Sequence, residues 1–282
     1  MRIVVCVKQI SHTYARTGMD PSRDYIAPED QVILTNPCDE AAMETAVRLK
    51  EENAGSQVIV VTLGPLLSEK ELRRLAAFGA DECVHIECNG ELDPWAKSVL
   101  LSRVLRSLEG DLVLCGRESL DRGNGQVGPF CARRLDMPFL GPLLEASVDL
   151  ERQKVRGVKK GRRGVRQVLE CPLPAVIGMD LGGLEIRFPS YEARVRAENV
   201  PVLKIEGGPV EAGPGTERKR VFPPKPRAGA VPAPDPRLSA EERIDFLLSG
   251  SRVEKKGEIL TGDADALAAE VAAYLEKEGF IP

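Results

Sequence analysis

The sequence predicts an α/β fold with a doubly wound, mainly parallel sheet. Short apolar runs typical of buried parallel strands occupy residues 2–8, 57–63, 82–86 and 112–115. The segments between these runs carry apolar residues at helical spacing. Because strands and helices alternate along the chain, parallel strands joined by crossover helices are favoured over hairpins.

Capping residues mark the starts of the helices. Asp39 suits the N-cap of a first helix, and Ser68 suits the N-cap of a second. A third helix is expected over 93–108, and a fourth begins near Gln126. A short strand at 31–35 precedes the first helix.

The pattern changes after Gly141. Residues 144–150, 154–158 and 165–171 indicate antiparallel strands around a charged hairpin, KKGRRG, at 159–164. Such a charge cluster is most typical of a solvated hairpin tip. Residues 174–179 return to a buried strand.

Composition predicts three regions: a nucleotide-binding α/β domain at 1–204, a proline- and glycine-rich linker at 205–240, and a helical arm at 241–282. The arm carries helical patterns at 240–248 and 263–278. A short amphipathic helix on a linker cannot bury its apolar face alone, so the arm is expected to dock either back on its own domain or, as a clasp, on a partner subunit.

Several classes of function are disfavoured by composition. With 39 basic and 43 acidic residues and 4% aromatic residues, the chain offers no electrostatic or stacking case for nucleic acid. No apolar segment reaches the ~20 residues of a membrane span, and the early first strand leaves no room for a signal peptide. We therefore expect no membrane insertion and a cytoplasmic protein.

Catalytic and metal chemistry also lack support in the sequence. The seven cysteines include no C-x-x-C pair, and the only histidines are His12 and His85. A disulfide framework, a zinc site and an iron–sulfur cluster all require ligand spacings that are missing here. We expect no catalytic acid, base or nucleophile and no metal ligand in this chain.

The most informative stretch is 111–129, DLVLCGRESLDRGNGQVGP. A buried strand leads into a loop with glycines at 116, 123 and 125, and then into a helix. Backbone N–H groups and the helix dipole at such a junction favour an anion, and Asp121 and Asn124 can bond sugar hydroxyls or a purine edge. An ordinary strand-to-helix turn has the same pattern, so this stretch alone leaves both interpretations open.

Four loop segments fall at carboxyl ends of strands or at helix starts: 6–9, 36–40, 63–65 and 116–126. Ligands of doubly wound sheets bind at this edge, near the point where strand order reverses. We therefore expect the four segments to converge on one pocket.

The loop GRESLDRGNGQVGP resembles the nucleotide-binding loop of the electron transfer flavoprotein β-subunit family. Ser119, Asp121, Gln126 and Gly128 match the family pattern, while Glu118 stands where glutamine is usual. Further landmarks that resemble the family are VKQ at 7–9, NPCDE at 36–40, VTLGP at 61–65, AFGAD at 77–81 and LPAV at 173–176.

The resemblance implies a Rossmann-like fold that binds an adenine-containing cofactor. The residues that it assigns to the cofactor lie in the converging segments: Cys6, Val7, Lys8, Asn36, Cys38, Asp39, Leu63, Gly64, Gly116, Arg117, Glu118, Ser119, Leu120, Asp121, Gly123, Asn124, Gly125, Gln126 and Val127.

The identity of the cofactor depends on the subtype. Ordinary members hold AMP in this subunit, whereas electron-bifurcating members hold a second FAD that exchanges hydride with NADH. Residues 7–9 and 125–129 are more similar to the bifurcating type and favour FAD; Glu118 and Arg122 depart from it.

The resemblance also implies partners. An electron transfer flavoprotein α-subunit would form a heterodimer with this chain, and an acyl-CoA dehydrogenase or related flavoenzyme would dock near Tyr191 and Arg194. A second class stays open, a nucleotide-sensing, stress-protein-like homodimer. ATP-binding enzymes of similar fold need a glycine-containing phosphate loop after the first strand. Residues 8–11 read KQIS and contain no glycine, which disfavours that class of enzyme.

Overall fold

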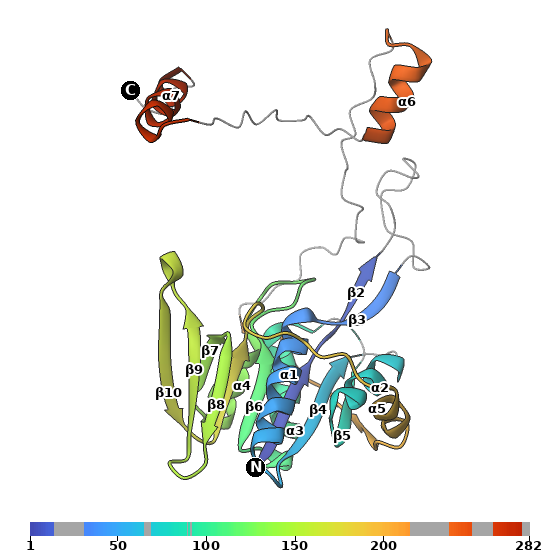
Figure 1. Cartoon of the computed structure of the whole chain (residues 1–282). Helices are drawn as coiled ribbons and strands as arrows, with labels where there is room; N and C mark the ends of the chain where they lie inside the picture. Colours follow the sequence, from blue (N-terminus) through green and yellow to red (C-terminus); the bar gives the residue numbers. More distant parts are fainter. Residues whose placement is uncertain are drawn as a thin grey trace. The chain divides into compact units, whose positions relative to one another are not determined.

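The computed structural model describes residues 1–13, 31–64, 69–88, 90, 92–214, 237–249 and 262–277. The described residues up to 214 form one compact unit, and two C-terminal helices belong to a second. The first unit contains all the β-structure of the described residues (Figure 1).

A seven-stranded sheet forms the centre of the first unit. Every neighbouring pair of strands in this sheet is parallel, which confirms the predicted fold class. Its strands, in spatial order, are β12 (Val202–Glu206), β5 (Glu82–Glu87), β4 (Gln57–Gly64), β1 (Arg2–Val7), β6 (Leu112–Gly116), β11 (Ala175–Met179) and β7 (Phe139–Leu143).

The strand order reverses between β1 and β6. From β1 the chain runs outward to β4 and β5, and then returns to β6 on the other side of β1. These two central strands pair from Ile3 with Leu112 to Cys6 with Cys115, so their carboxyl ends lie side by side. This is the switch point at which doubly wound sheets bind ligands.

Helices cover both faces of the sheet (Figure 1). Ile3 and Val5 of β1 face the core shared with α1 (Pro37–Glu52) and α2 (Glu69–Phe78). Val4, between them, faces α3 (Pro94–Leu108) and α4 (Val127–Leu135). Alternate residues of a strand point to opposite faces, so each central strand is apolar throughout.

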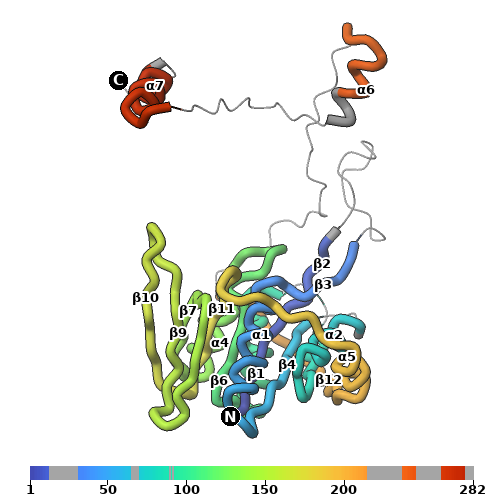
Figure 2. The backbone as a smooth tube through the Cα atoms, viewed as in Figure 1, coloured from blue at the N-terminus to red at the C-terminus, as the bar shows by residue number. Residues whose placement is uncertain are grey.

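A three-stranded antiparallel sheet, β8 (Glu145–Asp149), β9 (Lys154–Lys160) and β10 (Arg166–Pro172), confirms the expected change of pattern. Figure 2 shows β9 and β10 beside β7, and the N–H of Leu144, the residue after β7, donates a hydrogen bond to Val158 O of β9 (2.7 Å). The turn at Arg162–Gly164 is exposed, in agreement with a solvated tip.

Four elements were not expected from the sequence. The first is β2 (Gln9–Thr13), which forms an antiparallel pair with β3 (Gln31–Thr35), the strand that was expected at 31–35. The second and third are α5 (Tyr191–Ala197) and the strand β12 that follows it. The fourth, β7, reads FLGPL, and its glycine and proline are more typical of a loop. β7 and β12 are the two edge strands, where short and partly exposed sequences give weak patterns.

The C-terminal part contains α6 (Ala240–Ser249) and α7 (Ala264–Lys277), close to the helices predicted there. β12 takes in Ile205 and Glu206, which the sequence analysis placed in the linker. Ser68 and most of the linker, 215–236, lie outside the described residues. Within the parts of the chain that are described, no helix is long and apolar enough to cross a membrane.

Candidate functional site

A cavity of about 420 Å³ lies at the carboxyl ends of β1, β4 and β6, at the switch point. All four converging segments contribute to it, as expected from the sequence. It is lined by Cys6, Val7, Lys8, Gln9, Ile10, Ser11, Ile33, Asn36, Asp39, Leu63, Gly64, Cys88, Gly90, Leu92, Pro94, Lys97, Leu101, Cys115, Gly116, Arg117, Glu118, Ser119, Asp121, Arg122, Asn124, Gly125, Gln126, Val127 and Gly128.

Asp39 ties the two central strands together beneath this cavity. Its Oδ2 accepts a hydrogen bond from the backbone N–H of Lys8, and its Oδ1 accepts one from the N–H of Gly116, each at 2.8 Å. The prediction that Asp39 caps the helix was wrong in position: Pro37 is the first helical residue, so Asn36 is the N-cap. From the first turn of α1, Asp39 instead reaches the ends of β1 and β6.

The charge of Asp39 is costly to bury. The side chain is 5% exposed. Burial raises the pKa of Asp39 to about 7, although hydrogen bonds from Lys8 N–H and Gly116 N–H oppose the shift. The two N–H groups are therefore the main compensation for an ionised carboxylate at this place.

Asn36 holds the loop that follows β6. Its Oδ1 accepts from the N–H of Leu120 (3.0 Å), and its Nδ2 donates to the carbonyl of Glu118 (2.9 Å). Asn36 is 1% exposed, so its amide is committed to this loop. The loop thus has a fixed shape before any ligand binds.

The loop also requires glycine. Gly123 and Gly125 both have φ of +60°, a left-handed conformation that favours glycine. Across from them, Lys8 Nζ pairs with Asp121 (2.5 Å to Oδ1) and bonds Ser119 Oγ (3.1 Å). Burial raises the pKa of Asp121, but hydrogen bonding to Lys8 and Ser119 and the charge of Lys8 outweigh burial and lower it.

The amino end of α4 borders the same loop. Gln126 is its N-cap residue and makes no side-chain cap hydrogen bond. At Gly128 a Cβ would lie 2.6 Å from Cys115 Sγ, so glycine allows α4 to pack directly on β6. Free N–H groups and the helix dipole here favour a negative charge on the ligand.

The cavity extends beyond this loop to a region that sequence analysis missed, the α3 end, formed by Cys88, Leu92, Pro94 and Lys97. Burial lowers the pKa of Lys97, and repulsion from Lys8 and Arg122 lowers it further. Among the described residues, Lys97 Nζ has no hydrogen-bond or ion-pair partner. No sequence motif identifies Lys97 as a site residue. It lines the cavity only because α3 begins at this edge of the sheet, after β5.

Gln9 contributes a second unpartnered group. Both its amide nitrogen and its amide oxygen are buried and lack a hydrogen-bond partner. An unsatisfied buried amide is unfavourable by about 1–3 kcal/mol per group. Gln9 and Lys97 thus both line the cavity without a hydrogen-bond or ion-pair partner among the described residues.

Most of the predicted cofactor residues line the cavity, but three do not. Leu120 is 67% exposed and takes part through its backbone N–H. Cys38 is buried under Gly116, and Gly123 shapes the loop through its φ. Burial raises the pKa of the thiols of Cys6 and Cys115, so they stay protonated at neutral pH.

The two residues predicted to dock a partner lie elsewhere, on α5. Tyr191 is 81% exposed. Arg194 is also exposed and lines a second cavity, beside α2. Within the described ranges, no group of three His, Cys, Asp or Glu residues is placed to hold a metal ion.

The parallel, doubly wound sheet and the cavity at its switch point define a Rossmann-like α/β protein with a preformed ligand site. Residues 28–206 match the electron transfer flavoprotein domain. The chain belongs to the electron transfer flavoprotein family, as a member of the β-subunit or FixA-like type.

Three curated relatives illustrate the range of this type. The chain is 30% identical to "Protein FixA" of Azotobacter vinelandii, over 81% of this chain and 86% of that protein. It is 30% identical to "Electron transfer flavoprotein subunit beta" of Bacillus subtilis, over 90% and 100%. It is 32% identical to "Caffeyl-CoA reductase-Etf complex subunit CarD" of Acetobacterium woodii, over 81% and 90%.

Proposed function

We propose that this chain is the β-subunit of a heterodimeric electron transfer flavoprotein and that its cavity binds FAD. The observation that carries the choice of FAD is the α3 end of the cavity. AMP consists of a base, a ribose and one phosphate, for which the loop at 116–127 offers partners. The amide of Gln9 and the ammonium of Lys97 also line the cavity and have no partner, and FAD, with a second phosphate and a flavin ring, has more groups than AMP to supply one.

The residues of the loop fit the adenosine and phosphate part of such a ligand. Asp121, Ser119 and Asn124 present hydrogen-bonding groups for ribose or base, and the amino end of α4 favours phosphate. Bound FAD supplies the redox chemistry, while the protein binds it, orients it and limits access of water. No proton-transfer group of this chain is assigned a catalytic role.

Electrons would enter from NADH or from an acyl-CoA dehydrogenase-type flavoenzyme and leave toward another redox partner. The names of two relatives support an acyl-CoA-linked partner: the caffeyl-CoA reductase-Etf subunit, and "Acryloyl-CoA reductase electron transfer subunit gamma" of Anaerotignum propionicum, 28% identical over 88% of this chain. All seven cysteines are free, which agrees with a reducing compartment and supports a cytoplasmic location.

The regions outside the cavity are assigned to partners. The arm at 241–282 is proposed to clasp the α-subunit, because Val271 and Tyr274 of α7 are 47% and 59% exposed. The segment with Tyr191 and Arg194 is proposed to dock the redox partner. The alternative, an ordinary carrier with structural AMP, keeps the same heterodimer and is favoured by Glu118 and Arg122, which depart from the bifurcating pattern.

The test is the cofactor content of the heterodimer formed with the cognate α-subunit. Acid release and chromatography should give two FAD per heterodimer, and NADH should bleach one flavin under anaerobic conditions. Asp121→Ala and Gly125→Val should each remove one FAD and spare the FAD of the α-subunit, whereas Glu145→Ala, an exposed carboxylate on β8, should change nothing. One FAD with one AMP would identify an ordinary single-flavin carrier, and a stable homodimer without flavin would favour the nucleotide-sensing class.

A further inference from the structure

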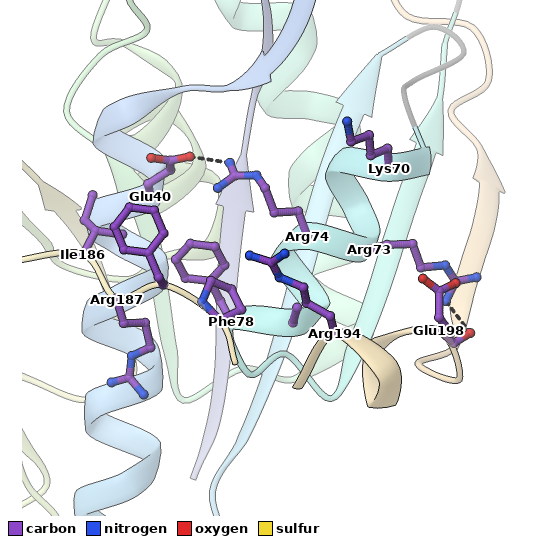
Figure 3. Close-up of a pocket in the computed structure, with 12 residues that line it drawn as sticks. Glu40, Lys70, Arg73, Arg74, Phe78, Ile186, Arg187, Arg194 and Glu198 are labelled. Atoms are coloured by element: carbon purple, nitrogen blue, oxygen red, sulfur yellow. Dashed lines mark hydrogen bonds and ion pairs between the residues drawn. The ribbon is translucent and has the colours of Figure 1, made fainter. Parts of the chain in front are cut away.

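A second cavity, of about 520 Å³, lies between α1, α2 and the segment that leads into α5 (Figure 3). It shares no lining residue with the first cavity. Its walls combine cations with apolar side chains: Glu40, Lys70, Arg73, Arg74, Ala77, Phe78, Ile186, Arg187, Phe188, Pro189, Arg194 and Glu198.

Three of its arginines are committed to partners inside the protein. Arg74 pairs with Glu40 and with Glu71. Arg73 donates to the carbonyls that follow α5, those of Ala197 (3.1 Å), Glu198 (3.0 Å) and Val200 (2.9 Å). These arginines build the walls, and their charges are largely compensated.

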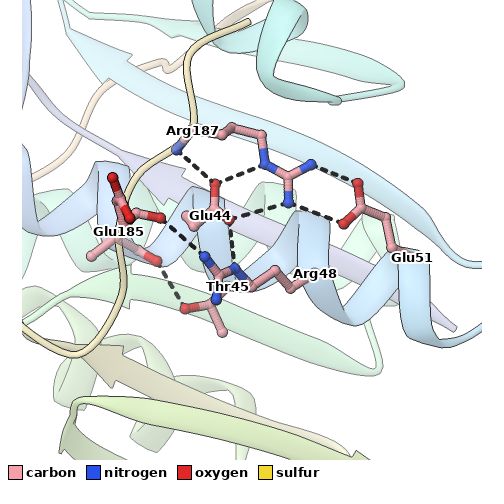
Figure 4. Close-up of polar contacts among 7 residues, drawn as sticks. Glu44, Thr45, Arg48, Glu51, Glu185 and Arg187 are labelled. Atoms are coloured by element: carbon pink, nitrogen blue, oxygen red, sulfur yellow. Dashed lines mark hydrogen bonds and ion pairs between the residues drawn. The ribbon is translucent and has the colours of Figure 1, made fainter.

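The third, Arg187, fastens one rim of the cavity to α1. It bonds Glu44, which is 1% exposed, at 2.9 Å and Glu51 at 2.5 Å (Figure 4). Arg48, one helical turn from Glu44, donates to the same carboxylate and to the carbonyl of Glu185 (3.0 Å). Residues 185–187 are therefore held rigidly, which places the next residue, Phe188, at the surface.

Two cations of the lining remain uncompensated. Lys70 of α2 and Arg194 of α5 are exposed, and no carboxylate is paired with either of them in the described part of the chain. Between the helices that carry them lies an apolar floor of Ala77, Phe78 and Ile186. A ligand that fits this surface brings negative charge and apolar contact together.

A protein segment satisfies this combination better than a small anion does. Phe188 is 93% exposed, and Tyr191 and Val195 on the following helix are 81% and 51% exposed. A phosphate or a free carboxylate leaves these apolar side chains in water. Aromatic side chains and arginines gathered at the surface are also the composition of protein–protein contact sites.

We propose that this cavity receives an acidic, partly apolar segment of the redox partner, with carboxylates at Lys70 and Arg194 and apolar side chains over Phe188. The proposal rests on the proposed function as an electron carrier. In this proposal the cavity belongs to this chain, and the segment that inserts into it belongs to the partner. Because Arg187 already fixes the rim, little ordering is required when the partner docks.

The probe is the acetylated, amidated peptide Asp-Leu-Glu-Phe-Asp, titrated into the purified heterodimer by calorimetry or NMR. The control peptide replaces the acids with their amides, as Asn-Leu-Gln-Phe-Asn. The acidic peptide should bind at least about tenfold more tightly than the amide peptide, and the difference should shrink as salt is raised. Equal binding of the two peptides, or no binding of either, overturns the proposal.

Variants of this chain locate the contact. Lys70→Glu and Arg194→Glu should each abolish the preference for the acidic peptide, and Ile186→Trp should block binding by filling the floor. Arg196→Glu is the matched control, since Arg196 is exposed on the same helix but does not line the cavity. Unchanged binding by Lys70→Glu, or displacement of the peptide by phosphate or acetate alone, overturns the proposal. Flavin content, measured on each sample, reports separately on the proposed function and on folding.

Discussion

The carboxylate of Asp39 accepts a hydrogen bond of 2.8 Å from the backbone N–H of Gly116, although 77 residues separate them. The contact places the first turn of α1 directly against the end of β6. A Cβ at position 116 would meet Oδ1 of Asp39 and lie 2.7 Å from Cβ of Cys38. The sequence requirement for glycine here thus comes from the close approach of a helix, in addition to any ligand.

Gly116→Ala should therefore destabilise the protein by about 2 kcal/mol, the usual range for overpacking a tight contact, and should lower the content of bound nucleotide. Gly262→Ala is the control, because a Cβ at that position meets nothing within 4 Å. Thermal unfolding and acid-released nucleotide measure the two effects. Normal stability in Gly116→Ala would show that α1 can move away from β6.

The raised pKa of Asp39, about 7, predicts a specific pH dependence of stability. Because the folded state holds the proton more tightly than the unfolded chain, the contribution of Asp39 is greatest below pH ~4 and is lost as pH rises through about 7. A shift of this size corresponds to at most ~4 kcal/mol. In Asp39→Asn this pH dependence is absent, so the stability of the wild type relative to the variant should fall as pH rises from ~4 to about 7. Parallel curves of unfolding free energy against pH for the two proteins would contradict the assignment.

Lys97→Met should have opposite effects on stability and on binding. Burial and the neighbouring cations Lys8 and Arg122 disfavour the charged form of Lys97, so Met at this position should stabilise the nucleotide-free protein at neutral pH. The same change removes the ammonium proposed to meet the cofactor, and FAD should be held about tenfold more weakly. Chemical denaturation and flavin retention on dialysis separate the effects. The control is Lys204→Met, at an exposed position on β12, which should change neither stability nor flavin retention. Unchanged flavin retention in Lys97→Met would show that Lys97 does not contact the cofactor.

Glu44→Gln should destabilise the protein by about 3 kcal/mol, because it leaves Arg187 and Arg48 without their buried partner. Although burial raises the pKa of Glu44, hydrogen bonds from Arg187 and Arg48 outweigh it and lower the pKa. The stabilisation is therefore present above the ordinary pKa of glutamate and is lost as pH falls through the lowered value. Hydrogen exchange at residues 185–188 should accelerate in the variant. Glu52→Gln, an exposed position at the end of the same helix, is the control.

Removal of residues 215–282 should weaken the heterodimer at least about tenfold and leave the first unit folded. The cut is placed after 214 because Gly207 N–H donates to Glu87 O (2.8 Å) and Gly213 N–H to Asp93 Oδ2 (2.7 Å). A point variant of the full chain, Val271→Asp, should reproduce part of the loss. Undiminished affinity of the truncated chain for the α-subunit would exclude the arm as a clasp.

The sequence was most informative where burial is complete. β1, β4 and β6 were predicted because central parallel strands are apolar on both faces, and the loop after β6 because its glycines need special backbone angles. β7 and β12 were missed, since an edge strand is selected by its neighbour more than by its own residues.

The candidate site shows the same division. Asn36 belongs to the contiguous motif at 36–40, and Asp121 and the loop glycines belong to the contiguous stretch 111–129, so the sequence identified them. Lys97 was missed, because it enters the cavity only through the start of α3, which follows β5 at the same edge of the sheet. Asp39 was placed in the right segment but given a local role as a helix cap, because its true partners, Lys8 and Gly116, are far away in the sequence.

Asp39 and Glu40 are consecutive residues of α1, yet Asp39 lines the first cavity and Glu40 lines the second. The wall between the two cavities is therefore a single helical turn, whose Glu40 is held by Arg74. A change in the backbone of this turn would therefore alter the walls of both cavities, because each cavity takes one of its lining carboxylates from it.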